Sequence, residues 1–420
     1  MSEITISRPN RVVGEIRVPS DKSTTHRSLM LGGLVGARIR HPLMGRDCAA
    51  TAECIRGLGC EVDWNAEEAV VRTAPWRSPD HPLDCGNSGT TIRLLSGLVA
   101  GFPITTTLTG DASLSRRPMG RITDPLRQMG ARIEGDRTPL RIEGGGLKGI
   151  AYASPVASGQ IKSCVLFAGL NAEGTTELTE PAPSRDHTER MLRSLGATLT
   201  DIPGGVRLEP GPLTGTLDLE VFGDISSAVF WAVLASATPN AQLMLRDVGV
   251  NPTRSGMLEV LQACGADFHR ENKRETAGEP VTDLVVDGSS NLRGFTIEGA
   301  LVPRLIDEIP ALAVLATQCR GTTTIRDAAE MRVKETDRIE VVTRYLAAMG
   351  AKVEATPDGM VIEGPTRLQG TTVDSRGDHR IGMAFAIAGC LADGETTILN
   401  ADEIGTSYPA FMDDLRKVTA

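Results

Sequence analysis

Basic residues stand at the start of several segments whose sequence pattern predicts a helix. Ser23 and Arg27 are four residues apart and would share one helical face, with Lys22 at the helix entry, where unpaired backbone amides already favour anions. Lys334 and Arg338 show the same spacing further along the chain. Cations in such places can bind phosphate or carboxylate groups, and arginine does so through two parallel hydrogen bonds. The chemistry indicated is the binding of a polyanionic ligand.

Other segments have the same character. Pro118, which suits the first position of a helix, follows Arg117. Gly86–Thr91 is a turn of small residues before a helix, where a ligand can approach the backbone closely. The remaining basic segments are Ser184–Arg190 and Asp378–Arg380. Because such cations recur in equivalent places on both halves of an acidic chain, we interpret them as one site for a polyanion between two domains.

The acidic, hydroxyl and glycine residues beside these cations also have a plain structural interpretation. Asp307 could be a helix-start acid that complements the helix dipole. Ser158 and Ser184 could be ordinary helix caps, and Gly89 an ordinary turn glycine. A single arginine at a helix start is usually a solvated surface residue. Residue types and spacing alone therefore leave the reaction open.

The elements that must position these residues repeat along the chain. A segment that predicts a helix end and then a short strand recurs, each time with a glycine suited to the left-handed conformation that closes a helix. Its glycines are Gly59, Gly130, Gly196, Gly265 and Gly350. Interleaved with it are apolar helices rich in alanine and glycine. We expect six α/β units of roughly 70 residues, with the apolar helices buried inside sheets and crossings between two halves near residues 19–21 and 223–227.

Composition excludes several classes of protein. The 420 residues carry a net charge of −9 and only 3% aromatic side chains. Such a chain is poorly suited to binding nucleic acid, because phosphate contacts need a basic surface and bases stack on aromatic side chains. The apolar runs stop well short of a membrane span, and no signal peptide is visible. The eight cysteines form no C-x-x-C pair and the six histidines no H-x-x-x-H pair. We expect buried, reduced thiols, no metal site and a cytoplasmic protein.

Seven motifs, in order along the chain, resemble those of the 5-enolpyruvylshikimate-3-phosphate synthase (3-phosphoshikimate 1-carboxyvinyltransferase) family. They are Asp21-Lys-Ser-x-x-x-Arg27, Gly86-Asn-Ser-Gly-Thr90, Arg117-Pro118, Ser158-Gly-Gln160, Gly223-Asp-Ile-Ser-Ser227, Arg332-Val-Lys-Glu-Thr-Asp-Arg338 and Asp378-His-Arg380. The resemblance implies an α/β fold of two similar domains, each three βαβαββ units with buried helices inside sheets. It implies a lower domain of residues 1–20 and 229–420, an upper domain of residues 21–228, and an active site in the cleft between them.

The resemblance also implies a reaction. Members of this family transfer the enolpyruvyl group of phosphoenolpyruvate to the 5-hydroxyl of shikimate 3-phosphate and release phosphate, through a tetrahedral intermediate of the shikimate pathway. Asp307 would be the base at that hydroxyl, with Glu335 and Lys22 as proton-transfer partners. The residues implied around phosphoenolpyruvate are Lys22, Gly89, Arg117, Gln160, Arg338 and Arg380. Those implied around shikimate 3-phosphate are Lys22, Ser23, Arg27, Ser158, Gln160, Ser184, Asp307 and Lys334. This chemistry requires no metal or organic cofactor, and the resemblance suggests a monomer.

The chain departs from the family pattern at three positions. Gly159 stands where many members have a second serine, and Glu330 where many have asparagine. Thr406 stands where some members have a lysine that reaches phosphoenolpyruvate. The last departure bears on the response to glyphosate, the family's inhibitor, although Gly89 is compatible with sensitivity.

Two alternatives remain at this point. The related enolpyruvyl transferase that acts on UDP-N-acetylglucosamine typically has Lys-Asn at the first motif and a loop cysteine, whereas this chain has Lys22-Ser23 and no cysteine in the segment from Ser113 to Arg117. A non-catalytic anion-binding protein of the same fold would need neither Asp307 nor Glu335. For the enzyme, we expect the substitution Arg338→Ala to weaken phosphoenolpyruvate binding most.

Overall fold

The computed structural model describes residues 2–276 and 278–420. The chain divides into two compact units: unit 1 contains Met1–Pro19, Phe222–Glu275 and Pro280–Ala420, and unit 2 contains Ser20–Val221 and Thr276–Glu279. The family resemblance placed the second domain boundary between residues 228 and 229, and that point lies inside helix α7 (Ile225–Ala237). The chain changes unit just before this helix, because α7 is buried along almost its whole length within unit 1.

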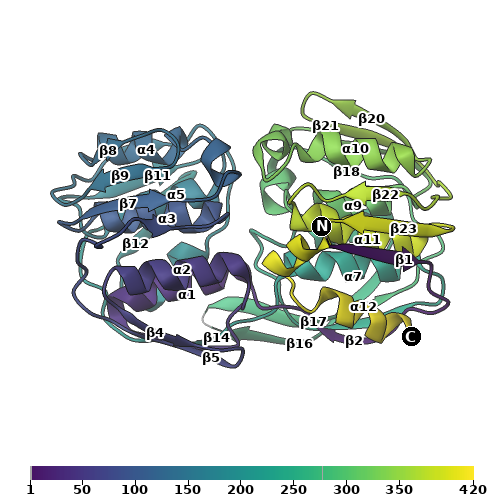
Figure 1. Ribbon diagram of the computed structural model, residues 1–420, viewed down its shortest axis with the longest axis horizontal. Coiled ribbons are helices and arrows are strands. Elements are labelled where there is room, and N and C mark those ends of the chain that lie inside the picture. The colour runs from purple at the N-terminus through teal and green to yellow at the C-terminus, as the bar shows by residue number, and fades with distance from the viewer. Residues whose placement is uncertain (1, 277) are drawn as a thin grey trace. The chain divides into compact units, whose positions relative to one another are not determined.

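Unit 2 repeats one connection of strands and helices three times (Figure 1). The first repeat contains β14 (Leu217–Glu220), α1 (Lys22–Val35), β3 (Ala37–Arg40), α2 (Arg46–Gly57), β4 (Glu61–Trp64) and β5 (Glu68–Arg72). The second contains β6 (Leu83–Asp84), α3 (Gly89–Ala100), β7 (Thr105–Thr109), α4 (Gly120–Gln128), β8 (Arg132–Glu134) and β9 (Leu140–Glu143). The third contains β10 (Ala151–Ala153), α5 (Gly159–Gly169), β11 (Thr176–Thr179), α6 (His187–Ser194), β12 (Leu199–Ile202) and β13 (Gly205–Leu208).

Unit 1 uses the same connection. Its first repeat contains β2 (Val13–Arg17), α7, β15 (Gln242–Gly249), α8 (Gly256–Cys264), β16 (Asp267–Thr276) and β17 (Glu279–Asp287). The second contains β18 (Thr296–Ile297), α9 (Ile309–Ala316), β19 (Gly321–Ile325), α10 (Arg338–Ala348), β20 (Lys352–Thr356) and β21 (Gly359–Gly364). The third contains β22 (Thr372–Asp374), α11 (His379–Leu391), β23 (Glu395–Leu399), α12 (Phe411–Thr419) and β1 (Glu3–Ser7).

Each complete repeat forms a four-stranded sheet of one topology. In the second repeat of unit 2 the order is β6-β7-β9-β8, with β6 parallel to β7 and both β7 and β8 antiparallel to β9. The last repeat of unit 1 lacks the closing hairpin and has three strands, ordered β1-β23-β22. There β1 runs antiparallel to β23, with Glu3 opposite Leu399. The expected fold of βαβαββ units is confirmed. In the three-stranded sheet of unit 1, the third strand is β1, which lies far from β22 and β23 in the sequence.

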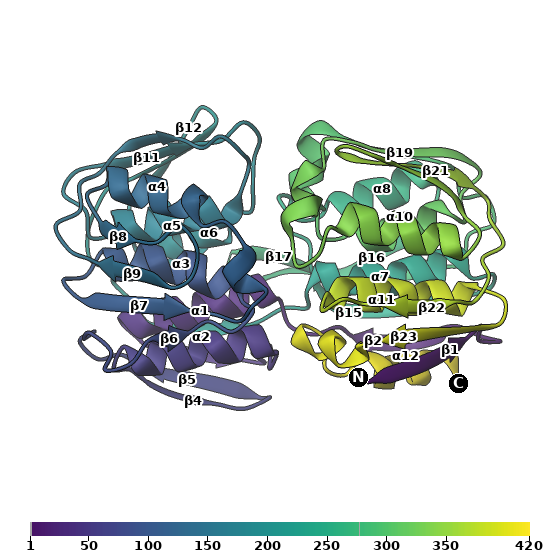
Figure 2. The ribbon, with the colours of Figure 1, turned by 45° about the horizontal axis from the view of Figure 1, so that its top comes forward.

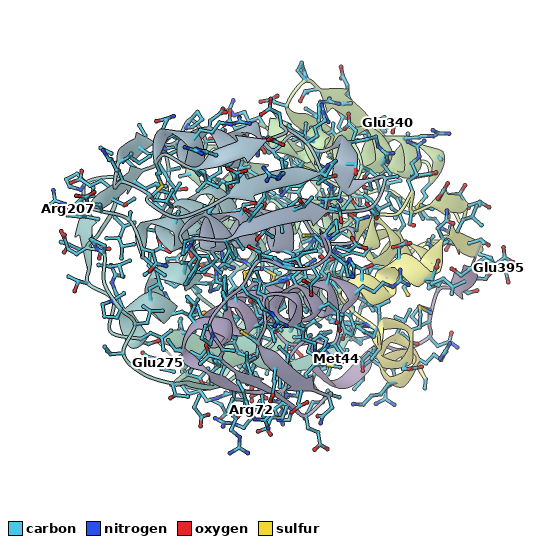
Figure 3. All side chains as sticks on the ribbon, turned by 60° about the vertical axis from the view of Figure 1, so that its left-hand side comes forward. Met44, Arg72, Arg207, Glu275, Glu340 and Glu395 are labelled. Atoms are coloured by element: carbon cyan, nitrogen blue, oxygen red, sulfur yellow. The ribbon has the colours of Figure 1, made fainter. Side chains whose placement is uncertain are left out.

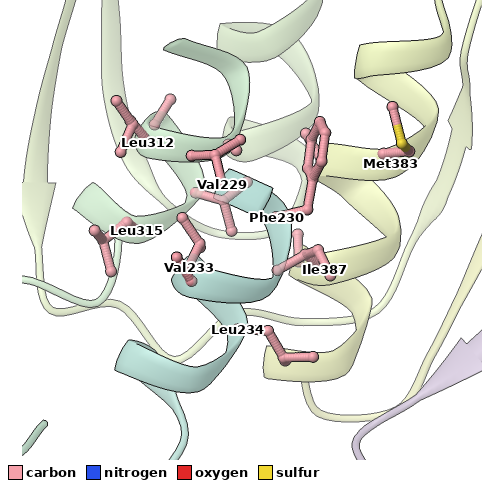
Figure 4. Packing of buried hydrophobic residues seen from close by; sticks show 14 of the residues in the cluster. Val229, Phe230, Val233, Leu234, Leu312, Leu315, Met383 and Ile387 are labelled. Carbon is pink, nitrogen blue, oxygen red and sulfur yellow. The ribbon is translucent and has the colours of Figure 1, made fainter. Parts of the chain in front are cut away.

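The apolar helices lie inside each unit and the strands outside, as expected (Figures 1 and 2). In unit 1, α7 packs against α9 and α11, and Figure 4 shows Val229 and Phe230 of α7 among Leu312 of α9 and Ile387 of α11. Unit 2 has a separate hydrophobic core around α3 and α5. Charged side chains such as Arg207 project outward from the sheets (Figure 3). Each unit therefore buries its own core.

The ends of the helices confirm the signals in the sequence. The repeat glycines all have positive φ, the conformation in which a side chain would be strained: Gly59 (111°), Gly130 (102°), Gly196 (83°), Gly265 (79°) and Gly350 (91°). At the start of six helices, the side chain of the residue just before the helix accepts a hydrogen bond from a backbone amide of the first turn. These helices are α1, α3, α5, α7, α11 and α10. These caps are Asp21, Ser88, Ser158, Asp224, Asp378 and Asp337. The caps hold in place the helix starts that carry the candidate site residues.

Candidate active site

The start of α1 places Lys22, Ser23 and Arg27 in unit 2. The Lys22 ammonium lies 3.1 Å from the carboxylate of Asp47 on α2. Arg27 is buried, and its guanidinium donates to the Thr188 hydroxyl at 2.7 Å and to the backbone carbonyl of Ser23 at 2.9 Å. A guanidinium fixed by neutral oxygens keeps its positive charge in one place. Such a fixed charge suits an anionic group of a ligand.

Gly89, the first residue of α3, lies beside two guanidinium groups. A Cβ atom built on Gly89 would be 3.0 Å from Nη1 of Arg93 and 3.2 Å from Nη1 of Arg117. Arg93 also donates to the Gln160 side-chain oxygen at 2.6 Å, and Arg117 donates to the side-chain oxygen of Asn87. The structure thus brings Gly89, Arg117 and Gln160 together through Arg93, which the sequence analysis did not single out.

The two candidate serines meet at one carboxylate. The backbone amide of Ser158 donates to Glu180 at 2.8 Å, and the Ser184 hydroxyl donates to the same carboxylate at 2.7 Å. Lys162 lies 3.1 Å from Glu180 and 2.9 Å from Glu189. Burial lowers the pKa of Lys162, but the carboxylates of Glu189 and Glu180 outweigh it and raise that pKa. The Ser158 side chain also caps the start of α5, which confirms the alternative interpretation of this serine as a helix cap.

Gly159 has a packing reason in this chain. A Cβ atom on Gly159 would lie 3.0 Å from Cβ of Arg185. The Arg185 guanidinium in turn lies 3.5 Å from the Ser23 hydroxyl. A serine at position 159 would require Arg185 to move. Arg185, which lies in the basic segment Ser184–Arg190, therefore belongs with the candidate cations of unit 2.

In unit 1 the candidate residues gather around one buried arginine. Arg338, the first residue of α10, is 1% exposed. Its guanidinium lies 2.8 Å from Asp378, 3.2 Å from Asp307 and 2.8 Å from Glu335. Burial alone would lower the pKa of Arg338, but the carboxylates of Asp378, Glu335 and Asp307 outweigh it and raise that pKa. Arg338 thus keeps its charge. Asp378, which belongs to the sequence motif Asp378–Arg380 but had no role of its own there, is a further residue of this site.

Asp307 is shared between further cations. The Lys334 ammonium lies 3.3 Å from the Asp307 carboxylate oxygen that Arg338 also contacts. Arg380 donates to the backbone carbonyl of Asp307 at 3.3 Å. The structure therefore brings Asp307, Lys334, Arg338 and Arg380 together, with Glu335 on the same arginine. A carboxylate between two cations, beside a second carboxylate, is suited to proton transfer within an anion-binding site.

A second buried polar cluster adjoins this group. Glu308 follows Asp307 and is fully buried, and it accepts a hydrogen bond from the Ser226 hydroxyl. Arg254 donates to that hydroxyl at 2.6 Å and lies 3.1 Å from the Asp224 carboxylate. Of these residues, the sequence indicated only the segment from Gly223 to Ser227. Arg254 and Glu308 came with no motif of their own.

Thr406 lies at the end of the 3-10 helix Ala401–Thr406 and is 9% exposed. Its hydroxyl lies 3.4 Å from the Glu403 carboxylate. Glu330 lies in the 3-10 helix Ala329–Val333 that precedes Lys334. Both positions belong to unit 1.

Across residues 2–276 and 278–420, histidine, cysteine and acidic side chains form no group of three that could hold a metal ion. All eight cysteines are buried free thiols, as expected. None of the helices in the described ranges combines the length and hydrophobicity needed to cross a membrane. The positively charged helix starts and their carboxylates are thus the chemistry-bearing features of the two units.

Comparison with known proteins gives a consistent result. A family model described as EPSP synthase (3-phosphoshikimate 1-carboxyvinyltransferase) matches residues 6–415. The chain is 48% identical over 429 residues to 3-phosphoshikimate 1-carboxyvinyltransferase of Bacillus cereus (strain 03BB102), with 100% of both chains covered. It is 48% identical over 415 residues to the protein of that name from Bacillus thuringiensis (strain Al Hakam), with 97% of this chain and 96% of the other covered.

Two solved structures are also similar. EPSP synthase from Acinetobacter baumannii has a TM-score of 0.88 and 41% identity, covering 100% of this chain and 98% of the other. The enolpyruvyl transferase NikO from Streptomyces tendae has a TM-score of 0.78 over 99% of this chain and 96% of the other. At 18% identity, the second likeness speaks for the fold alone.

Proposed function

The chain belongs to the EPSP synthase (3-phosphoshikimate 1-carboxyvinyltransferase) family, and on this basis we propose which of its residues carry the reaction. It is an enzyme that transfers the enolpyruvyl group of phosphoenolpyruvate to the 5-hydroxyl of shikimate 3-phosphate and releases phosphate. The observation that carries the assignment of residues is the Asp307 carboxylate, 3.3 Å from Lys334 and 3.2 Å from Arg338.

Binding comes first in this proposal. The two substrates carry two phosphates and two carboxylates, so fixed cations must offset their mutual repulsion. We assign phosphoenolpyruvate to Lys22, Gly89, Arg117, Gln160, Arg338 and Arg380. We assign shikimate 3-phosphate to Lys22, Ser23, Arg27, Ser158, Gln160, Ser184, Asp307 and Lys334. Holding both substrates removes much of the entropic barrier to their reaction.

Proton transfer follows. Asp307 accepts the proton of the 5-hydroxyl as that oxygen bonds to C2 of phosphoenolpyruvate. Glu335 and Lys22 are the proton-transfer partners at the enol carbon C3 and at the bridging phosphate oxygen, and the addition, in which C3 gains a proton, gives the tetrahedral intermediate. In the elimination, Glu335 accepts a proton from C3 and the bond between C2 and the phosphate oxygen breaks, so that phosphate leaves with the electron pair of that bond and the enol ether remains. Two carboxylates with different neighbours can divide this acid and base work.

The remaining assignments follow the family. The protein acts as a cytoplasmic monomer, and its reaction proceeds without a metal or organic cofactor. Arg93 and Arg185 support the substrate groups bound by Gly89 and Ser23, since each guanidinium lies beside one of these residues.

The deciding experiment is phosphate release from phosphoenolpyruvate, with shikimate 3-phosphate and UDP-N-acetylglucosamine offered in parallel. We expect release with shikimate 3-phosphate only. If phosphate were released only with UDP-N-acetylglucosamine, the acceptor proposed here would be wrong. Folded protein that is silent with both acceptors would be an anion-binding protein of this fold.

A further inference from the structure

A hollow of about 430 Å³ on unit 1 lies away from the residues assigned to the reaction. It is lined by Asn291, Arg293, Gly294, Arg320 and Thr322. This volume is within the range of pockets that bind small molecules. The hollow opens where the strands β18 and β19 begin, and β19 lies in the outer sheet of unit 1 (Figure 2).

The backbone at this hollow is fixed by a pattern that recurs in other repeats. Arg293 and Arg320 face each other in a parallel bridge. The same bridge joins Lys148 to Glu173 in unit 2 and Gln369 to Asp393 in the last repeat of unit 1. In each case a glycine follows the first bridge residue and donates its amide to the carbonyl of the second, at 2.9, 2.8 and 2.7 Å respectively. The three places are therefore structurally equivalent.

The charges at the three places differ. Lys148 faces Glu173, and Gln369 faces Asp393, so in two repeats an acid stands opposite a cation or a neutral residue. Only here, among these three bridges, do two arginines face each other. Like charges directly opposite in a sheet are destabilising. The arginine pair therefore stabilises the sheet less than the facing residues at the two equivalent bridges do.

No acidic group of the described chain neutralises the pair. Neither Arg293 nor Arg320 forms an ion pair within residues 2–276 and 278–420. The neighbouring acid on the sheet is Glu363, which is opposite Thr322 of β19. Glu363 is itself opposite Lys352 of β20, so its charge already faces a cation. The hollow therefore carries an excess of positive charge on an otherwise acidic protein.

We propose that this hollow binds a phosphate-bearing small molecule, clamped between the guanidinium groups of Arg293 and Arg320. Arginine matches phosphate oxygens with two parallel hydrogen bonds, and two arginines side by side can hold one phosphate or diphosphate group. Asn291 and Thr322 line the same hollow and supply neutral donors and acceptors for the rest of the ligand. The bound anion removes the repulsion between the two arginines.

Calorimetric titration of the full-length protein with inorganic diphosphate tests the proposal. The variant Arg320→Glu restores the cation–acid pairing of Lys148 and Glu173, and Arg293→Gln introduces the residue found at the equivalent position 369. Arg270→Glu, on the exposed strand β16, changes the net charge by the same amount as Arg320→Glu and is the matched control. Diphosphate that binds the substrate site would do so in all four proteins, so the comparison isolates the hollow.

We expect the wild type and Arg270→Glu to bind one more equivalent of diphosphate than Arg320→Glu and Arg293→Gln, or to bind it at least about tenfold more tightly. All four proteins should release phosphate from phosphoenolpyruvate at the same rate, which shows that the variants are folded. Parallel titrations with inorganic phosphate and with ATP show whether the hollow prefers a free phosphate anion or a phosphate ester. Equal stoichiometry and affinity in all four proteins, for all three probes, would overturn the proposal.

Discussion

The Arg338 guanidinium and the Asp378 carboxylate form an ion pair of 2.8 Å, and their side chains are only 1% and 0% exposed. Asp378 also caps α11 by accepting from the amide of Arg380 at 3.0 Å. One carboxylate therefore fixes the start of α11 and the arginine that begins α10. Both helix starts carry residues that we assign to phosphoenolpyruvate.

This pair predicts that Asp378→Asn lowers both stability and activity. Removing one partner of a buried ion pair typically costs about 3–5 kcal/mol. Because Arg338 keeps Glu335 and Asp307, we expect a loss near the lower end, measured by urea unfolding. The control is Asp413→Asn, which breaks an exposed pair with Arg416 and should change stability little. Equal stability of the two variants would contradict a structural role for Asp378.

The substitution Arg338→Ala should raise the KM for phosphoenolpyruvate, but it also leaves three carboxylates around a buried gap. Arg380→Gln separates binding from stability, because the Arg380 side chain makes a single long hydrogen bond, of 3.3 Å, to a backbone carbonyl. We expect Arg380→Gln to raise the KM for phosphoenolpyruvate at least about tenfold with an unchanged unfolding curve. Steady-state kinetics measures this, and a rise confined to the KM for shikimate 3-phosphate would reassign Arg380.

For Asp307→Ala, we expect a correctly folded protein with kcat lower by about 10²–10⁴-fold, the usual contribution of a general acid or base. The substitution also removes the 3.3 Å contact between Asp307 and Lys334, so the KM for shikimate 3-phosphate should change as well. Single-turnover phosphate release measures the step directly. A variant with a near-normal rate would remove Asp307 from the mechanism.

Gly89→Ala places a methyl group 3.0 Å from Arg93 and 3.2 Å from Arg117. These distances are tight for a Cβ atom, so both guanidinium groups must shift, and the KM for phosphoenolpyruvate should rise more than kcat falls. The matched control is Gly211→Ala, because a Cβ atom there meets nothing within 4 Å. If both variants had wild-type kinetics, Gly89 would be an ordinary turn glycine.

His26 predicts a pH dependence of stability. Burial, together with the charges of Lys22 and Arg27, holds the pKa of His26 well below its usual value of 6.5. The unfolded chain therefore binds a proton below about pH 6.5 that the folded chain refuses, and stability falls as the pH drops through this range. Between pH 7.5 and 5.5, the fall in the free energy of unfolding should be smaller for His26→Gln than for the wild type by about 1.4 kcal/mol, measured by urea unfolding. The exposed His269→Gln should leave the difference unchanged.

The sequence predicted the repeated elements because their signals are local. A glycine such as Gly350 closes a helix through its own backbone conformation, and a cap such as Ser158 acts on an amide three residues away. Lys22, Ser23 and Arg27 were likewise found from the spacing within one helix.

The partners that fix the site were not predictable in this way. Asp378 lies 40 residues from Arg338, and Glu308 is 82 residues from the Ser226 hydroxyl that it accepts from. Such pairs form only when separate repeats pack together, and a lone acid in the sequence gives no sign of its partner. Arg93 was missed for the same reason, since it reaches Gln160 across 67 residues.

The pairing of β1 with β23 has a consequence for synthesis on the ribosome. Residues 3–7 are made long before residues 395–399, which are their partners in the sheet. The third sheet of unit 1 therefore stays incomplete until residues 395–399 have been translated. Unit 2, whose main segment ends at Val221, has all three of its sheets within that segment. Unit 2 can therefore fold during translation, whereas β1 can enter its sheet only after β23 has been made.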